Sequence, residues 1–251
     1  MPPIVPMLAT KSSPSPITGT LTGTAIRPQQ SMECIEAAVR EHIASWSPSA
    51  MNIANSLQAN EVNLCSSLCI HLNQVKGDAP FHFHHQPPQG RRNLDIGLVP
   101  QSVEGITVDN HAYHRGEFFY AIEAKVMPLT GARKREYVVS EYTALADPTK
   151  KRMGAIERFK QGDHAPKLVR SSIVAFVQKI PQTPWMAVIN GWIDDLIPTI
   201  PAVHDEPWST ADHLAEVSTS AGLDEYRSTH TRPALAPIRM CHFLLYLAGK
   251  N

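Results

Sequence analysis

The stretch FFYAIEAKV, residues 118–126, is a nearly continuous apolar run of strand length. A run of this kind is typical of a central strand that is covered on both faces of its sheet. Because side chains alternate between the faces of a strand, the apolar even-numbered residues from 120 to 126 share one face, and Glu123 and Lys125 share the other. A carboxylate and an ammonium therefore project from an otherwise hydrophobic strand, which is unfavourable unless both charges have partners.

A second strand with an acidic residue precedes this stretch. In NLDIGLVP, residues 93–100, the apolar positions 94, 96 and 98 alternate with Asp95 and Gly97. Consecutive strands usually lie side by side, so we expect Asp95 near Glu123, although 27 residues separate them in the chain. A metal ion that faces both carboxylates would neutralise them.

Two amphipathic helices are predicted before these strands. Residues 32–46 place apolar side chains at helical spacing, with charged residues on the other side. The second helix is predicted to begin with Asn60 as its N-cap and to end at Gly77-Asp78. Residues 81–84 then alternate phenylalanine with histidine, which indicates a strand.

Four further elements are predicted after the central run. We expect a helix over much of 151–161, a buried strand over 172–178, a helix over 185–196 and a last strand over 238–247 that returns to the sheet. The whole order is helix, helix, three strands, helix, strand, helix and tail strand. This order indicates an α/β fold with a mixed sheet.

Asp95 followed by Glu123-Ala124-Lys125, after a helix that carries Glu61, resembles the PD-(D/E)XK phosphodiesterase superfamily, which has the restriction-endonuclease-like fold. The core of that family is a mixed sheet flanked by helices, in the order helix, three strands, helix, strand. The matching part runs from about residue 61 to 178, about half the chain. Leu94 takes the place of the proline in the family motif, at a position that varies widely among members.

The resemblance implies a Mg²⁺-dependent nuclease. Asp95 and Glu123 would bind the ion, with the carbonyl of Ala124 as a further ligand, and Mn²⁺ can substitute. Lys125 would position or help to deprotonate the attacking water and would stabilise charge on the phosphate. Glu61 matches a helix glutamate that many members place near the metal. An acid in the first turn of a helix is also favoured by the helix dipole, so a capping role for Glu61 stays open.

The simpler interpretation of Asp95 and Lys125 is a buried ion pair in an ordinary α/β domain. Such pairs are uncommon on central strands, because the desolvation penalty can exceed the Coulombic gain. This consideration favours the catalytic interpretation.

Several polar residues are candidates for contact with nucleic acid. Arg158 and Lys160 lie on the helix that borders the active site in the family, where cations can hold a phosphate backbone. A solvated helix face is the simpler interpretation for Lys160, whereas Arg158 is the stronger candidate. Arg133 and Arg135 belong to the same basic segment. Gln178, at the end of the last core strand, could face the site or simply end the strand.

The charges of the chain are balanced overall but unevenly distributed. It has 251 residues with 23 basic and 23 acidic side chains, which excludes a generally basic nucleic-acid coat protein. Residues 131–170 carry ten basic and five acidic side chains, and residues 181–240 carry three basic and eight acidic ones. We expect the basic segment to lie along DNA with modest affinity, helped by a homodimer or a protein partner.

The composition also predicts how the chain is organised. Residues 1–30, rich in Pro, Ser and Thr, are expected to form a flexible arm. Residues 31–251 are expected to form one nuclease-like domain, with its core at about 60–180 and a C-terminal extension at 181–251. No apolar run is long enough to span a membrane, the first ten residues do not resemble a secretory signal, and the four scattered cysteines suit a reducing cytoplasm.

Two other functions remain open at this stage. The first is a non-catalytic binding or assembly module on the same fold, with the acidic segment as its protein-contact surface. The second is a zinc-dependent enzyme built on His82, His84 and Cys69, although the cysteines lack the spacing of a zinc knuckle. The sequence contains neither a glycine-rich phosphate loop nor a Gly-x-Ser-x-Gly elbow. Our leading hypothesis is a nuclease that acts on DNA in restriction, repair or defence against mobile DNA.

Overall fold

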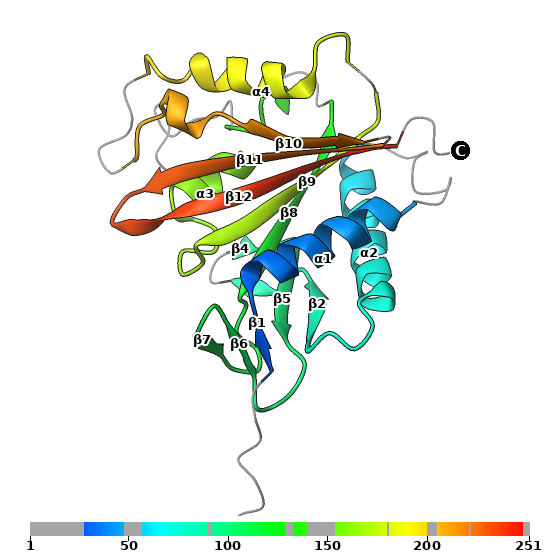
Figure 1. Ribbon diagram of the computed structural model, residues 1–251. Helices are drawn as coiled ribbons and strands as arrows, with labels where there is room; N and C mark the ends of the chain where they lie inside the picture. The colour runs from blue at the N-terminus through cyan, green and yellow to red at the C-terminus, as the bar shows by residue number, and fades with distance from the viewer. Residues whose placement is uncertain are drawn as a thin grey trace, which may run out of the picture.

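The centre of the computed structural model is a seven-stranded mixed sheet with helices on both faces (Figure 1). The structure describes residues 28–47, 57–89, 92–128, 133–139, 154–179, 181–199, 205–220 and 222–247. The strand order is β10-β11-β12-β9-β8-β5-β2, in which β8, β9 and β12 run parallel and the remaining neighbours are antiparallel. The expected α/β class with a mixed sheet is confirmed.

The strands of the large sheet are β2 (Phe81–His85), β5 (Ile96–Pro100), β8 (Tyr120–Met127), β9 (Arg170–Val177), β10 (Ala215–Ser220), β11 (Leu223–Arg232) and β12 (Leu235–Tyr246). A small sheet consists of β1 (Gln29–Gln30), β6 (Ile106–Val108) and β7 (His111–Tyr113), and a two-stranded pair of β3 (Pro88–Gln89) and β4 (Arg92–Asn93). The helices are α1 (Met32–Ser45), α2 (Leu57–Val75), α3 (Ala155–Lys160) and α4 (Trp185–Asp194), with a 3₁₀ turn η3 (Thr210–Asp212).

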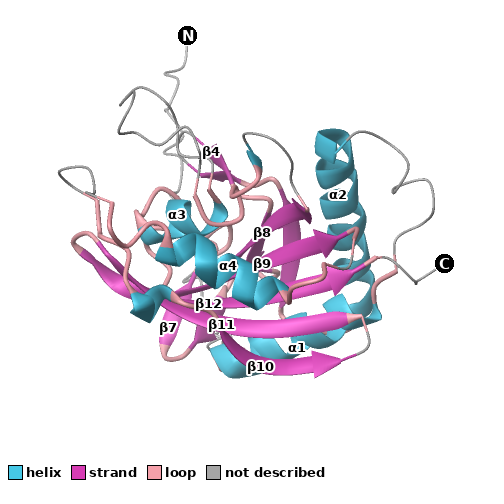
Figure 2. Ribbon diagram, turned by 90° about the horizontal axis from the view of Figure 1, so that it is seen from above, coloured by secondary structure: helices cyan, strands magenta, loops and turns pink. Residues whose placement is uncertain are grey.

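The helices divide the core into two layers. The apolar sides of α1 and α2, including Ile35 and Leu68, pack against the even-numbered residues of β8. On the opposite face, α3 and α4 pack against odd-numbered residues of β9, with Phe159 and Ile189 fully buried. Figure 2 shows α3 and α4 on the same side of the sheet. The central strand is therefore covered on both faces, as its apolar run predicted.

Most predicted elements are present, with shifted boundaries. The helix predicted at 32–46 is α1, which begins after the N-cap Ser31, whose hydroxyl accepts the N–H of Cys34 at 3.2 Å. The prediction of Asn60 as an N-cap is wrong, because α2 begins at Leu57 and residue 60 lies inside it. Residues 151–153 of the helix predicted at 151–161 lie outside the described residues, and α3 ends at Lys160.

The C-terminal part belongs to the same sheet as the predicted core. Residues 239–246 of β12 pair in parallel with β9, and β10 and β11 continue the sheet beyond β12. The sequence predicted β12 but not the two strands that precede it. The strands β10, β11 and β12 therefore widen the sheet beyond β9, which would otherwise be an edge strand.

Part of the expected N-terminal arm is ordered. Gln29 and Gln30 form β1 and pair in parallel with Thr107 and Val108 of β6. Residues 1–27 of the arm lie outside the described residues. In the part of the chain that the structure describes, no helix combines the length and the apolar character needed to cross a membrane.

Candidate active site

The candidate site lies where β8 extends beyond the end of β5. The two strands pair only from Ile96 with Ile122 to Leu98 with Tyr120, so the following part of β8 has an edge that β5 does not cover. Two carboxylates take up the N–H groups of this edge. Asp95 Oδ2 accepts the N–H of Ala124 at 2.8 Å.

Glu61 accepts the next N–H group along the same edge of β8. Its Oε2 accepts the N–H of Val126 at 3.1 Å. Glu61 reaches this edge from the second turn of α2, and the first turn of that helix contains no acidic residue. The capping interpretation of Glu61 is therefore wrong, because the residue lies too far into the helix to stabilise its N-terminal dipole.

Glu123 and Lys125 project from β8 toward α3 and are buried, with 2% and 4% of their surfaces exposed. The ammonium Nζ of Lys125 lies 3.2 Å from Glu123 Oε1 and 3.3 Å from Glu61 Oε1. Asp95 sits in the bend immediately before β5, one residue outside the predicted strand position. No ion pair joins Asp95 to Lys125 among the described residues, so the simple buried pair expected as the alternative is absent from this part of the structure.

Lys125 carries a positive charge in this environment. Burial lowers the pKa of the Lys125 ammonium, but the carboxylates of Glu61 and Asp95 outweigh burial and hold the pKa above its ordinary value. A protonated ammonium cannot accept a proton from an attacking water. Lys125 is therefore suited to orienting a water and stabilising negative charge on phosphate, rather than to acting as a general base.

Arg158 and His164 complete the surroundings of Glu123. The guanidinium Nη2 of Arg158, on α3, forms an ion pair with Glu123 Oε1, and its Nη1 lies 3.4 Å from His164 Nε2. Because a guanidinium only donates, we assign the imidazole proton to Nδ1, which lies 3.5 Å from Glu123 Oε2. His164 is not predictable from the sequence, because a single histidine in a loop has no signal that separates it from the other eleven.

The oxygen donors of this site fit a magnesium ion that keeps most of its water. Glu61, Asp95 and Glu123 bring three negative charges, against two positive charges from Lys125 and Arg158. Glu123 Oε2 is buried, and apart from the 3.5 Å contact with His164 Nδ1 it makes no hydrogen bond to the described residues. The carbonyl of Ala124 projects to the same strand edge as its N–H, toward Asp95.

The described residues contain no group of three or more Asp, Glu, His and Cys side chains that converge as a metal site. Magnesium is commonly held by only one or two carboxylates together with waters and substrate phosphate. Asp95 and Glu123, with the carbonyl of Ala124, could therefore hold the ion, whereas an all-protein cage could not form from these side chains.

Lys160 is neither a nucleic-acid contact nor part of a solvated helix face, so both interpretations of the sequence are wrong. Its side chain is fully buried, and its Nζ lies 3.0 and 3.2 Å from the two carboxylate oxygens of Asp212 and 5.3 Å from the centroid of the Trp208 ring. Phosphates cannot reach an ammonium that has no exposed surface. Lys160 is a structural residue that anchors α3 to η3.

Arg133 and Arg135 are both paired with acidic residues. Arg133 forms an ion pair with Glu136, and the hydrogen bond to Glu136 raises the pKa of Arg133. Arg135 lies 3.8 Å from Asp195. About a third of each side chain is exposed, so both guanidinium groups remain accessible. Residues 140–153, which contain other cations of the basic segment, lie outside the described residues.

Gln178 comes directly after β9. Its backbone N–H donates to the carbonyl of Met127 at 2.7 Å. Two residues after Phe176, it continues the face of the sheet opposite to that of Glu123 and Lys125. Among the described residues, no hydrogen bond joins the side chain of Gln178 to the other candidate residues.

The three residues of the zinc hypothesis do not form a site. Cys69 is buried, with its Sγ 3.5 Å from the carbonyl of Phe83, and burial raises the pKa of its thiol to about 11. His84 Nδ1 contacts its neighbour's carbonyl at 3.1 Å. A thiol that stays protonated and two histidines on an exposed strand face do not provide zinc ligands.

A second polar cluster lies buried between α3 and the C-terminal strands. His230 Nδ1 lies 2.7 Å from Asp212 Oδ1, and His230 Nε2 lies 2.7 Å from the hydroxyl of Ser228. The same hydroxyl lies 2.7 Å from His242 Nε2, and His242 Nδ1 lies 2.9 Å from the hydroxyl of Tyr137. The contacts of Ser228 with His230 and of His230 with Asp212 resemble a Ser-His-Asp triad. Because Ser228 is buried, we interpret the cluster as structural.

Comparison of the chain with protein-family models, with curated protein sequences and with solved structures finds no match.

Proposed function

We propose that the protein is a Mg²⁺-dependent phosphodiesterase that hydrolyses nucleic acid, with DNA as the expected substrate. The observation that carries the proposal is the buried ammonium of Lys125 between Glu61 and Glu123, next to the uncovered edge of β8 where Asp95 accepts the N–H of Ala124. Structural ion pairs do not need an excess of carboxylates over cations. A site that binds a divalent cation needs such an excess, because the carboxylates must balance the charge of the ion.

The order of elements supports the same proposal. From α2 to β9 the chain forms a helix, three strands of the large sheet, a helix and a further strand of the same sheet. This is the order that the PD-(D/E)XK resemblance implies. Asp95 and Glu123 lie on the second and third of these strands or directly beside them, with Lys125 two residues after Glu123.

Each residue then has a task that its position allows. Asp95, Glu123 and the carbonyl of Ala124 would hold the ion, which when bound supplies Lewis-acid stabilisation of the phosphate. Lys125 orients a water for attack on phosphorus and stabilises the charge that develops there. The water oxygen bonds to phosphorus as the bond to the leaving oxygen breaks, and the proton lost by the water ends on that leaving oxygen. Arg158 binds the scissile phosphate once it no longer pairs with Glu123.

A non-catalytic module on the same fold is the competing function. One observation favours it: Asp95, Glu61 and Glu123 all contact protein groups already. In that case the carboxylates would only satisfy the edge of β8 and the buried cations, and no divalent ion would bind.

The deciding experiment combines a cleavage assay with calorimetry. Single- and double-stranded DNA and RNA are incubated with Mg²⁺ or Mn²⁺ and the wild type, Glu123→Gln or Lys125→Met. We expect metal-dependent cleavage by the wild type, a loss of about 100- to 1000-fold in kcat for Lys125→Met, and no measurable Mg²⁺ binding to Glu123→Gln. Lys76→Met, at a lysine outside the basic segment 131–170, is the matched control and should cleave normally.

Calorimetry separates the two functions. Mg²⁺ binding that disappears in Glu123→Gln supports the phosphodiesterase, even if the assay lacks the preferred substrate. If the wild type binds no Mg²⁺ and cleaves nothing, the phosphodiesterase proposal is wrong and the non-catalytic module is the better interpretation.

A further inference from the structure

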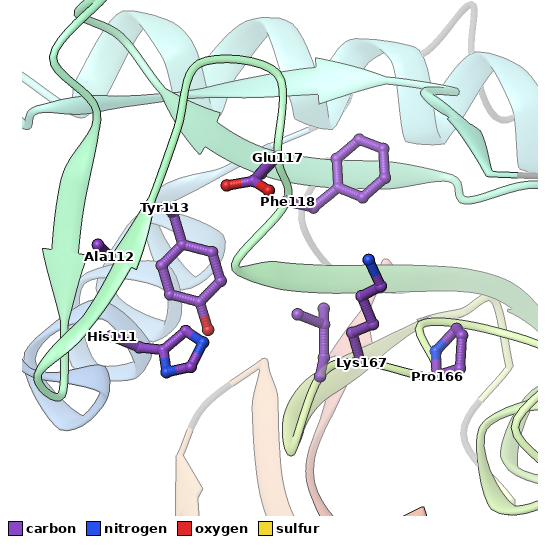
Figure 3. A pocket seen from close by; sticks show the side chains of 8 residues that line it. His111, Ala112, Tyr113, Glu117, Phe118, Pro166 and Lys167 are labelled. Carbon is purple, nitrogen blue, oxygen red and sulfur yellow. The ribbon is translucent and has the colours of Figure 1, made fainter.

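A pocket of about 480 Å³ opens between the small sheet and the loop that follows α3 (Figure 3). Its lining residues are His111, Ala112, Tyr113, Glu117, Phe118, Pro166, Lys167 and Leu168. In Figure 3, Tyr113 and His111 stand on one side, and Lys167 and Pro166 on the other. A volume of this size is in the range of pockets that bind small molecules or parts of larger ones.

The lining favours a flat aromatic group next to a negative charge. The Tyr113 ring contacts two other rings in tilted arrangements, with centroids 5.4 Å away in His111 and 5.7 Å away in Phe119. A ring that is already fixed provides a stacking surface with little further loss of entropy. Lys167, across the pocket, has an exposed ammonium that can contact an anion. A nucleobase attached to its phosphate combines both features.

The pocket and the candidate active site are built from the same two segments. His164 contacts Glu123, and the pocket residue Leu168 follows His164 by only four residues, which spans at most about 14 Å. Phe118, on the other side, lies two residues before β8, which carries Glu123. The pocket is therefore lined by the segments that also hold Glu123 and its neighbour His164.

We propose that this pocket binds one unstacked nucleobase of the strand that is cleaved at Glu123. The inference rests on the proposed function and makes it more specific. Bases in a duplex are stacked and paired, so a base can enter the pocket only from a single strand or from a locally opened duplex. The preferred substrate is therefore single-stranded or distorted nucleic acid.

The test measures binding rather than cleavage. Fluorescence anisotropy in EDTA compares an oligodeoxythymidylate with a strand of the same length that carries abasic sugars, so that the number of phosphates is equal. We expect the wild type to bind the abasic strand about 5- to 150-fold more weakly, as for the loss of one stacked base. Tyr113→Ala should weaken binding to the normal strand by a similar factor and leave binding to the abasic strand unchanged.

Two further variants guard against a folding defect. Tyr113→Phe keeps the stacking ring and should bind as the wild type does, and His111→Ala changes an exposed residue of the same wall and should give a smaller loss that is again specific to the normal strand. A thermal unfolding curve for each variant shows whether the fold is intact. Equal effects of Tyr113→Ala on both strands, or no measurable binding of either strand, would overturn the proposal.

The outcomes also distinguish this inference from the proposed function. If the protein shows metal-dependent cleavage but Tyr113→Ala affects both strands equally, the phosphodiesterase proposal is supported and the base-pocket proposal is wrong. Coupling without metal-dependent cleavage supports the base pocket in a protein that binds nucleic acid but does not cut it.

Discussion

At the scale of single residues, Arg158 determines which groups can reach Glu123. Its guanidinium pairs with Glu123 Oε1, and in the proposed function the same guanidinium binds the scissile phosphate. Because a guanidinium keeps its charge at all accessible pH values, it cannot release the carboxylate by losing a proton. In the proposed function, a divalent ion at Glu123 would therefore compete with the guanidinium for this carboxylate.

Arg158→Ala should separate metal binding from catalysis. We expect Mg²⁺ to bind at least about tenfold more tightly, because no cation competes for Glu123. Cleavage should fall by about 100- to 1000-fold, because the phosphate loses a charged donor. Calorimetry and the cleavage assay measure the two effects, and Arg40→Ala on α1 is the control. A loss of metal binding would show that Arg158 holds Glu123 in position instead of competing for it.

Lys160 leads to a prediction about stability. Lys160→Met leaves Asp212 buried without the ammonium, and we expect the free energy of unfolding to fall by about 3–5 kcal/mol. Affinity for nucleic acid should be unchanged at temperatures where the variant is folded. Urea unfolding measures the first effect, with the exposed Lys134→Met expected to change stability by less than about 0.5 kcal/mol. An unchanged midpoint for Lys160→Met would contradict the structural role of Lys160.

At the scale of elements, α3 is positioned by the segment 133–139. The N–H groups of Ala155, Ile156 and Glu157 donate to the carbonyls of residues 136, 137 and 138 at 2.9–3.2 Å. This contact requires Gly154, since a Cβ there would lie 2.5 Å from Val139 Cα. The placement of Arg158 therefore depends on a glycine four residues earlier.

Gly154→Ala should destabilise the protein and weaken its activity together. We expect a decrease of about 1–3 kcal/mol in the free energy of unfolding, because the backbones of α3 and residues 138–139 must move apart. Gly191→Ala is an informative control, because a Cβ at this helical position meets nothing within 4 Å. It should raise the stability by about 0.5–1 kcal/mol. Urea unfolding of both variants checks the opposite signs, and a neutral Gly154→Ala would refute the close approach.

At the scale of the whole molecule, the buried polar cluster connects the helical layer to the C-terminal strands. Burial, with a smaller effect of His230, lowers the pKa of His242 to about 3, far below its ordinary value. His242 is therefore neutral in the folded state at pH values where it is protonated in the unfolded chain. The unfolded state binds more protons between about pH 3 and 6.5, so stability decreases as the pH falls through this range.

The free energy of unfolding should decrease by about 1.4 kcal/mol for each pH unit between about pH 6 and 3 on account of His242 alone. Burial also lowers the pKa of His230, which acts in the same direction. Urea unfolding at a series of pH values measures the slope. In His242→Gln the slope should be smaller by that amount, and an identical slope in the variant would show that His242 does not titrate on unfolding.

The sequence determined much of this protein by itself. Hydrophobic periodicity is local, so α1, β8, β9 and α4 were predictable, as was the pairing of Glu123 and Lys125 on one strand face. The sequence did not reveal β10. All six residues of this strand are exposed, so they show no alternation between a buried face and a solvent face.

Only the tertiary structure decided which charges meet. Lys160 and Arg158 are two residues apart on one short helix, yet one is buried against Asp212 and the other pairs with Glu123. Their partners lie 52 and 35 residues away in the chain, and no local pattern contains them. The position of β12 beside β9 depends likewise on contacts between distant segments. Burial and ion pairing are set by such contacts, and the chain must fold before they exist.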